Sequence, residues 1–494
     1  MHVFGVEGEG DSHPGGAGMA IQKKSEQRQG ILPYRIEYEG EGPQLTSYSG
    51  LPVVAETYQA LGLSNAVREH VEVKERARGF TESEMVESFC LLLAAGGECL
   101  DDFEALRADA GLAEMVGHKL PSPEAARQFL YKFHDEEEEK RREEEMRKAG
   151  EKSYVPKENA ALGGLAKVNR ELVRRVQKAK VEEVATLDAD ATIIESAKEE
   201  AYPTYEGGCG YQPTTVLWVE QGMVVADEFR DGNVPAKKDI ARVVRQAVEG
   251  LPEGVKTIRL RADSAGYTQE LMEYCREETG GKPRIEFAIS AEMSQQLRAE
   301  IDVLPEGTWK AWSEDAHVVR EWSEVAYVPS ERSPKKETKP DRYVAIRLTK
   351  KQGEMFADGS GVMYFAVVTN RWEVDGAELL KWHRAKAGTI EKVHDVMKNE
   401  LGAGVMPCGR FGANAAWFRM SVLTYNLLAA LKRVGGLDAK LANARPKRLR
   451  FLVFNVAAEL VHHARALVVR VTRRWVEGPS LVPIRAALLL LLTG

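Results

Sequence analysis

The chain has 494 residues, of which 44% are hydrophobic and 29% charged, and this is enough for about two to four domains with proper hydrophobic cores. The formal net charge of -7 argues against an indiscriminate basic nucleic-acid binder, although it leaves room for local basic patches. The five cysteines are widely spaced, with no CxxC motif and no Cys/His cluster, so a structural zinc site has no support and a reducing cytosol fits.

The first part of the chain predicts an arm followed by helices. Residues 1–33 are rich in glycine, serine, histidine and charge, which predicts a disordered arm without the apolar segment of a signal peptide. Residues 34–133 predict a helical N-terminal domain, in which Thr81-Glu82-Ser83-Glu84 is a capping box and Ser122-Pro123 supplies an N-cap followed by proline. Such helices can include a DNA-binding helix-turn-helix, and they are as often domains that pack only on their neighbours.

A charged boundary leads into a region of strands. Residues 134–160 mix acidic and basic side chains and predict a linker or solvated helix, followed by a helix over 169–180. The stretch Leu187-Asp188-Ala189-Asp190-Ala191-Thr192 then alternates as a strand does, so Asp188 and Asp190 share one face opposite an apolar face. Two like charges side by side favour a nearby cation, a proton or solvent, and an exposed strand in water would satisfy the same pattern.

A second aspartate follows a later strand. Residues 214–219 and 223–229 predict a hairpin, 237–248 a helix and 255–264 a strand that ends at Asp263, before a helix that Thr268 can cap. Ligands of open α/β sheets bind at the carboxyl ends of strands, so Asp263 is a candidate site residue. Aspartate is also a routine turn and capping residue.

The next segment, 284–376, reads as β-rich, and helix returns after it. Thr389 is expected to cap a helix over 390–401, whose buried stripe consists of Ile390, Val393, Met397 and Leu401. The polar face of the same helix consists of Glu391, His394, Asp395 and Lys398. Surface salt bridges are the ordinary explanation for such a face.

Taken together, the three acidic positions suggest one chemistry. An aspartate in a first strand, an aspartate at the end of a later strand and a glutamate on a helix beyond an insertion make the carboxylate set that two-metal phosphoryl transfer requires. Carboxylate oxygens suit Mg²⁺ or Mn²⁺, and two ions roughly 3.5 to 4 Å apart activate the attacking oxygen and stabilise the leaving one.

Four stretches carry a family resemblance: LDADATIIE at 187–195, GYQP at 210–213, LRADSAGY at 260–267 and KAGTIEKVHDVMKNELGAGVMPCGRFGANAAWFRMSVLTYNLL at 386–428. From about Gly50 to about Trp475 the sequence resembles the DDE transposases of bacterial insertion sequences, in the group numbered thirteen-eighty, which is related to the group-four transposases. The resemblance implies an α/β fold: an RNase H-like catalytic core over 161–283 and 377–435, interrupted by the β-rich insertion 284–376, preceded by the helical N-terminal domain and followed by C-terminal helices over 436–494.

The resemblance also implies site residues. It places the catalytic, metal-binding carboxylates on Asp190, Asp263 and Glu391, with Asp188 as an alternative for the first, and Lys398 matches the family's lysine seven residues after the glutamate. The tyrosine and arginine that usually precede the glutamate have no clean match. Their neighbourhood holds Trp382, His383, Arg384 and Lys386, of which Arg384 and Lys386 are candidate DNA contacts.

The last part of the chain is basic and then apolar. Between Arg445 and Arg474 the only acid is Glu459, which predicts a basic face for phosphates, with Arg470, Arg473 and Arg474 as candidate DNA contacts. The alternative is that this segment packs on the catalytic domain. Packing and phosphate contact are compatible with each other. Trp417 and Trp475 are better assigned to the core than to base stacking. The run Ala486–Leu492 is too short to cross a bilayer and predicts a buried or dimer-facing helix end.

By this resemblance the protein is expected to cleave insertion-sequence ends and to join the freed 3′-hydroxyl to target DNA, using two Mg²⁺ or Mn²⁺ ions. The expected partners are double-stranded DNA, as terminal inverted repeats and as target, and a second copy of the chain in a homodimer. The expected location is the bacterial cytoplasm, at the nucleoid when active, without a membrane. One alternative is a catalytically silent, DNA-binding relative that regulates transposition, and another is a general RNase H-like nuclease.

Overall fold

The computed structural model describes residues 44–74, 78–148, 153–277, 284–329, 341–351, 354–472, 474–475 and 480–493. The chain divides into two compact units, Met1–Pro43 and Gln44–Gly494, and all described residues belong to the second. The arm expected over residues 1–33 lies outside the described residues, as does Arg473.

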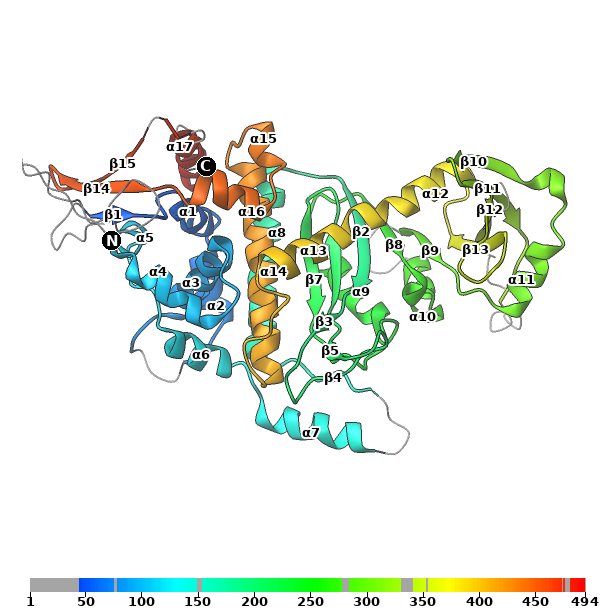
Figure 1. Cartoon of the computed structure of the whole chain (residues 1–494), viewed down its shortest axis with the longest axis horizontal. Helices are drawn as coiled ribbons and strands as arrows, with labels where there is room; N and C mark the ends of the chain where they lie inside the picture. The colour runs from blue at the N-terminus through cyan, green and yellow to red at the C-terminus, as the bar shows by residue number, and fades with distance from the viewer. Residues whose placement is uncertain are drawn as a thin grey trace, which may run out of the picture. The chain divides into compact units, whose positions relative to one another are not determined.

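The second unit is built on a nine-stranded mixed sheet in the order β10-β11-β12-β13-β9-β8-β2-β6-β7 (Figure 1). Its strands are β2 (Val184–Ala191), β6 (Thr214–Trp218), β7 (Met223–Glu228), β8 (Thr257–Ala262), β9 (Ile285–Ser290), β10 (Lys310–Glu314), β11 (Val318–Val325), β12 (Arg342–Lys350) and β13 (Val362–Thr369). The strands β2, β8 and β9 are parallel to one another, and the other pairings are antiparallel. The strands of the β-rich segment therefore extend the same sheet that contains the first aspartates.

Two three-stranded sheets flank the large one. The first, in the order β3-β5-β4, consists of β3 (Ile194–Glu195), β4 (Tyr202–Pro203) and β5 (Cys209–Tyr211) and follows directly on β2. The second, in the order β1-β14-β15, consists of β1 (Leu45–Thr46), β14 (Ala458–His463) and β15 (Ala466–Val471). It pairs the start of the described chain with a segment near its end.

Two of the helices before the sheet begin at the capping residues that the sequence predicts, whereas the helix expected over 169–180 begins earlier, at Ala160. The helices before the sheet are α1 (Pro52–Ala60), α2 (Leu63–His70), α3 (Glu82–Ala95), α4 (Phe103–Ala108), α5 (Ala110–Val116), α6 (Pro123–Tyr131), α7 (Glu136–Arg147) and α8 (Ala160–Ala179), with the short turn η1 (Leu100–Asp102). The capping box of Thr81 and Glu84 and the N-cap of Ser122 are both formed. The charged helix α7 is not fully solvated, because Arg142 is buried and donates hydrogen bonds to Asp231 at 2.7 Å.

The later helices include the central one of the unit. They are α9 (Ile240–Glu249), α10 (Gln269–Arg276), α11 (Gln295–Asp302), α12 (Gly376–Arg384), α13 (Ile390–Glu400), α14 (Phe411–Val434), α15 (Ala439–Ala442), α16 (Pro446–Leu449) and α17 (Leu481–Thr493), with the short segments η2 (Ser264–Gly266), η3 (Glu306–Thr308), η4 (Ala385–Gly388) and η5 (Arg450–Phe454). Figure 1 shows α14 between the N-terminal helices and the sheet, and it packs on α3, α6, α8 and β7. Trp417 on α14 is fully buried and donates to the Gly402 carbonyl at 2.8 Å, as expected of a core residue.

The C-terminal region differs from the expected set of helices. Residues of β14 and β15 form an antiparallel hairpin, and Ala464 and Arg465 at its tip have positive φ angles of 49° and 66°. Two consecutive residues with positive φ are what a tight hairpin turn of this hand requires. The valines around this turn favour strands, and the basic composition that drew attention to the segment carries no information about secondary structure.

The apolar C-terminal helix α17 packs on α1. Leu481, Ile484 and Leu488 are buried, whereas Leu489, Leu490 and Leu492 are exposed. Within the described ranges no helix combines the length and apolar character needed to cross a membrane.

Candidate active site

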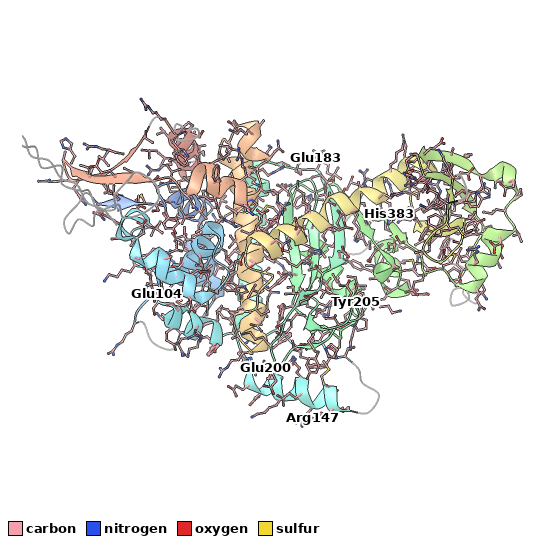
Figure 2. All side chains as sticks on the ribbon, viewed as in Figure 1. Glu104, Arg147, Glu183, Glu200, Tyr205 and His383 are labelled. Carbon is pink, nitrogen blue, oxygen red and sulfur yellow. The ribbon has the colours of Figure 1, made fainter. Side chains whose placement is uncertain are left out.

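The two candidate aspartates end neighbouring parallel strands. In the pairing of β2 with β8, Ala189 lies opposite Ala262, so Asp190 and Asp263 are the next residues on each strand. Both carboxyl ends point to the same edge of the sheet, away from Glu183, which precedes β2 and is labelled in Figure 2. This edge is where open α/β sheets bind their ligands.

The environment of Asp190 opposes its negative charge. The pKa of Asp190 is raised to about 6, mainly by burial and also by the neighbouring carboxylate of Asp263, while the ammonium of Lys386 acts in the opposite direction. The Lys386 Nζ lies 3.3 Å from Asp190 Oδ2 and is itself largely buried. The structure therefore places Lys386, a candidate DNA contact, inside the site as the counter-ion of the first aspartate.

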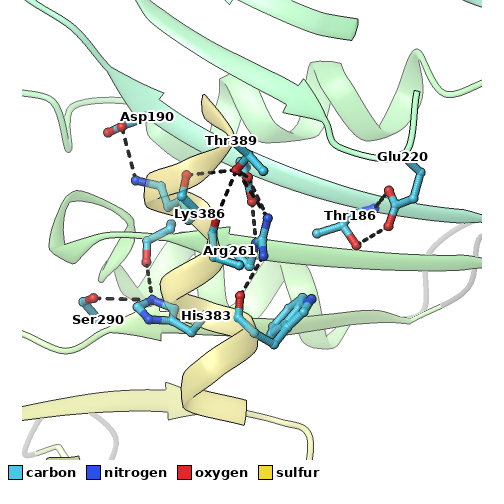
Figure 3. A network of polar contacts seen from close by, with 12 residues as sticks. Thr186, Asp190, Glu220, Arg261, Ser290, His383, Lys386 and Thr389 are labelled. Carbon is cyan, nitrogen blue, oxygen red and sulfur yellow. Dashed lines mark hydrogen bonds and ion pairs between the residues drawn. The ribbon is translucent and has the colours of Figure 1, made fainter. Parts of the chain in front are cut away.

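Asp188, the alternative first carboxylate, is held by contacts with Arg261 and Thr389, both labelled in Figure 3. It is fully buried and accepts hydrogen bonds from Arg261 Nε at 2.6 Å, from Arg261 Nη2 at 2.8 Å and from the Thr389 hydroxyl. Arg261 also donates to the Trp382 carbonyl at 2.6 Å. Its carboxylate is thus already neutralised and hydrogen-bonded, which a buried charge requires.

The contacts of Thr389 correct one prediction. Thr389 precedes α13, but its side chain makes no capping hydrogen bond and instead donates to Asp188. The backbone of Thr389, with φ -113° and ψ -79°, is in the helical region and not in the extended region from which an N-cap side chain accepts from the first helical N–H groups.

The helices α12 and α13, joined by η4, cross the sheet on the side of these aspartates. His383 Nε2 lies 3.1 Å from the Ala262 carbonyl, His394 Nε2 lies 2.6 Å from the Thr215 hydroxyl, and Lys398 Nζ donates to the Ile193 carbonyl at 3.1 Å. Burial lowers the pKa of His383 to about 4 and of His394 to about 3, so both rings are neutral at pH 7. His394 therefore belongs to the buried side of α13, although the sequence assigns it to the polar face.

The glutamate of the expected triad has no polar partner in the described structure. Glu391 is exposed in the first turn of α13, and among the described residues its carboxylate makes no hydrogen bond or ion pair. Asp263 caps η2 by accepting from the Ala265 N–H at 3.1 Å. The parts of the chain that are described contain no group of three or more His, Cys, Asp or Glu side chains arranged to hold a metal ion.

The aspartate pair nevertheless has the chemistry of a cation site. Two carboxylates that repel each other at a sheet edge, one of them with a raised pKa, form a donor set of the kind that Mg²⁺ or Mn²⁺ prefers. One ammonium, that of Lys386, faces Asp190 and only partly offsets the burial.

The other candidate DNA contacts lie outside this pair. The Arg384 guanidinium is exposed and lies 5.6 Å from the centre of the Trp312 ring. Arg470 on β15 is 3.5 Å from Glu459 in an exposed ion pair, and Arg474 is exposed. These cations come from separate surface segments and are not brought together with the aspartates.

Sequence reasoning missed the roles of two residues at the site. It assigned no role to Arg261 and named Lys386 only as a candidate DNA contact, yet each neutralises an aspartate of β2. The alternation of β8 does place Arg261 on the same face as Asp263, which is a usable signal. No comparable local signal exists for Lys386, whose partner lies far away in the sequence.

These features define a mixed α/β protein with paired aspartates at the ends of two parallel strands and a cationic helix segment across them. The model of a protein family described as "Transposase DDE domain group 1" matches residues 30–491. The chain therefore belongs to the DDE transposase family. Among solved structures it is similar to a piggyBac transposase in a synaptic complex with hairpin DNA, studied by cryo-EM, with 9% identity, a TM-score of 0.46 and coverage of 84% of this chain and 83% of that one. A search of curated proteins finds no match.

Proposed function

We propose that this protein is a DNA transposase of a bacterial insertion sequence of the group numbered thirteen-eighty, which cleaves the ends of its element and joins them to target DNA. The observation that carries the proposal is the pair of Asp190 and Asp263 at the ends of adjacent parallel strands, in a chain that belongs to the DDE transposase family. The same proposal makes double-stranded DNA the partner, a homodimer the acting form and the bacterial cytoplasm the place of action.

We also propose that the core of the sheet is RNase H-like. The order β7-β6-β2-β8-β9 supports this, because the first three strands are antiparallel and the last two run parallel to β2. The strands β10 to β13 would then be the insertion that separates the second aspartate from the helix bearing Glu391.

In this proposal Asp190 and Asp263 hold divalent ions, and Glu391 completes the set. Bound Mg²⁺ or Mn²⁺ would activate the attacking oxygen and neutralise charge on the phosphoryl group. The ammonium of Lys386 partly neutralises the negative charge of Asp190. The hydrogen bonds among Asp188, Arg261 and Thr389 fix the segment that carries Lys386. Lys398 and Arg384, and farther away Arg470, Arg473 and Arg474, are the proposed contacts to DNA phosphates.

The test uses purified full-length protein, Mg²⁺ and linear DNA that carries the inverted repeats flanking the reading frame. We expect nicks at the element ends on a denaturing gel. Asp263→Asn should abolish nicking while a gel-shift assay still shows binding, because the substitution removes a metal ligand and leaves the basic surfaces intact. Asp302→Asn, at a surface aspartate paired with Arg298, is the matched control and should nick as the wild type does.

One observation favours the catalytically silent regulator as a second candidate. Among the described residues no three-carboxylate metal site is formed, and a lysine faces the first aspartate. A wild type that binds the ends and never cuts them, with Mg²⁺ or with Mn²⁺, would support the regulator. Equal cutting of unrelated DNA would instead support a general nuclease.

A further inference from the structure

A hollow of about 610 Å³ adjoins Asp263 and has no assigned role. Its walls include Tyr205, which follows β4, Gln212, which follows β5, and Lys237 and Glu292. Figure 2 labels Tyr205 at the end of the sheet opposite Glu183, which is the end where β2 and β8 finish. The hollow therefore lies beside the proposed reaction site and on the same edge of the sheet.

The side chain of Gln212 is unpaired in this hollow. Gln212 is 3% exposed, its backbone N–H donates to the Arg230 carbonyl at 2.8 Å, and its Oε1 is buried without a hydrogen-bond partner among the described residues. The described structure gives its side-chain amide no hydrogen bond at all. A buried polar group without a partner costs free energy, so a folded protein is expected to keep one where a ligand supplies the missing bonds.

The backbone around Gln212 is held firmly. Gly210 has no room for a Cβ, because the Ile194 carbonyl of the adjacent strand β3 occupies that space. Pro213 follows directly, and the Thr192 N–H donates to its carbonyl at 3.0 Å, which ties this segment to the end of β2. The amide of Gln212 is thus presented in a fixed place in the hollow that Asp263 also lines.

Two other residues that line the hollow supply a ring and a cation. The Tyr205 side chain is strongly exposed, at 75%, and lines the hollow together with Asp263. Lys237 is exposed and lies 3.5 Å from Glu292, so its ammonium borders the hollow as well.

We propose that this hollow binds a nucleobase of the DNA strand next to the phosphodiester that Asp190 and Asp263 act on, with Gln212 hydrogen-bonded to the base edge and Tyr205 stacked on its face. A primary amide carries a donor and an acceptor side by side, which matches the paired groups on a base edge, and glutamine pairs in this way with adenine. An aromatic ring stacks on any base. This inference rests on the proposed function and assigns a subsite for its substrate.

The experiment measures binding of the wild type, Gln212→Leu and Tyr205→Ala to the element-end duplex by fluorescence anisotropy in EDTA. In a series of duplexes a single abasic residue replaces each nucleotide around the cleavage position in turn. We expect one abasic position to weaken wild-type binding roughly 5- to 100-fold, the range of a lost base stack. Each variant should weaken binding to intact DNA and should lose the sensitivity to that one position. Trp372→Ala, at an exposed ring on another segment, is the control and should keep the wild-type pattern.

Variants that weaken binding to all duplexes equally, with the abasic sensitivity unchanged, would overturn the base subsite. Because Tyr205 is exposed, its truncation tests the inference even if Gln212→Leu disturbs the fold. A wild type that binds and nicks the ends but shows no sensitive position would overturn the subsite alone. A wild type that does not bind the ends at all would overturn both this inference and the proposed function.

Discussion

At the scale of the residue, the protonation state of the Asp190 carboxyl decides when the proposed metal site is ready to bind a cation. Asp190 has a pKa raised to about 6, mainly by burial, so below that pH a proton occupies the carboxyl in the absence of metal. A metal ion must displace this proton, because the ligand form is the carboxylate.

We therefore expect the affinity for Mn²⁺ to rise with pH and to level off above about pH 6. Below that value the affinity should fall by roughly tenfold per pH unit, if one proton is released for each ion bound. Isothermal titration calorimetry between about pH 5 and pH 8, in buffers of different ionisation enthalpy, measures both the affinity and the proton release. An affinity that does not change over this range would contradict the assignment of Asp190 as a ligand.

Lys386 permits a second test at the same scale. Lys386→Met removes the only ammonium that faces Asp190 within the described structure and leaves two neighbouring carboxylates uncompensated. In EDTA we expect the variant to melt at a lower temperature than the wild type. The corresponding loss in the free energy of unfolding is up to roughly 3 kcal/mol. Added Mn²⁺ should restore most of the difference, since a divalent ion replaces the missing positive charge.

The control for this test is Lys381→Met, at an exposed lysine on α12, which should change stability little with or without metal. Differential scanning fluorimetry with EDTA and with Mn²⁺ compares the two variants. An equal loss of stability in both conditions would mean that Lys386 has a role in packing only.

At the scale of the element, the helices α12 and α13 depend on one buried ion pair. Asp188 joins β2 to Arg261 of β8 and to Thr389, and Arg261 reaches on to the Trp382 carbonyl at the end of α12. Removing one partner of a buried pair is more damaging than replacing both, because the remaining charge stays buried.

Asp188→Asn should therefore lower the free energy of unfolding by about 3 to 5 kcal/mol in urea titrations, through the uncompensated guanidinium of Arg261. Asp190→Asn should cost less stability and should abolish Mn²⁺ binding. The two variants thus separate the two candidates for the first carboxylate. Retained Mn²⁺ binding in Asp190→Asn, with loss of binding in Asp188→Asn, would reverse the assignment.

Local patterns in the sequence predicted much of this arrangement. The alternation around Asp188 and Asp190, the strand that ends at Asp263, the capping residues Thr81 and Ser122, and the buried stripe of α13 are all short-range features. The pairs Asp188 with Arg261 and Asp190 with Lys386 join segments far apart in the chain, and charge type alone does not choose among many cations. The hairpin of β14 and β15 was missed because its arginines drew attention to charge and not to the valines of β15, which favour a strand.

At the scale of the whole molecule, the proposed DNA binding must be reconciled with a net charge of -7. The proposal therefore depends on local basic segments such as the β14–β15 hairpin, where Arg470 is exposed and only loosely paired at 3.5 Å with Glu459. Each phosphate contact releases counter-ions and adds to the salt dependence of binding.

We expect Arg470→Ala and Arg474→Ala each to weaken binding to the element ends and to reduce the slope of log affinity against log salt concentration by about 0.9. Fluorescence anisotropy over a range of KCl concentrations measures the slope. Arg298→Ala, on the surface of α11 and paired with Asp302, should leave it unchanged. If Arg470→Ala and Arg474→Ala leave the slope unchanged, this basic segment packs on the protein and does not contact DNA phosphates.

The pairing of β1 with β14 bears on how the protein is made. Leu45 and Thr46 find their strand partner only at Glu459 and Ala458, and Ser49 donates from both its backbone and its hydroxyl to the Val456 carbonyl. During synthesis the ribosome must translate as far as Glu459 before these early residues can be covered. A premature stop codon upstream of Ala458 would leave the emerging helices without their closing strand, so such fragments should become substrates for chaperones and proteases.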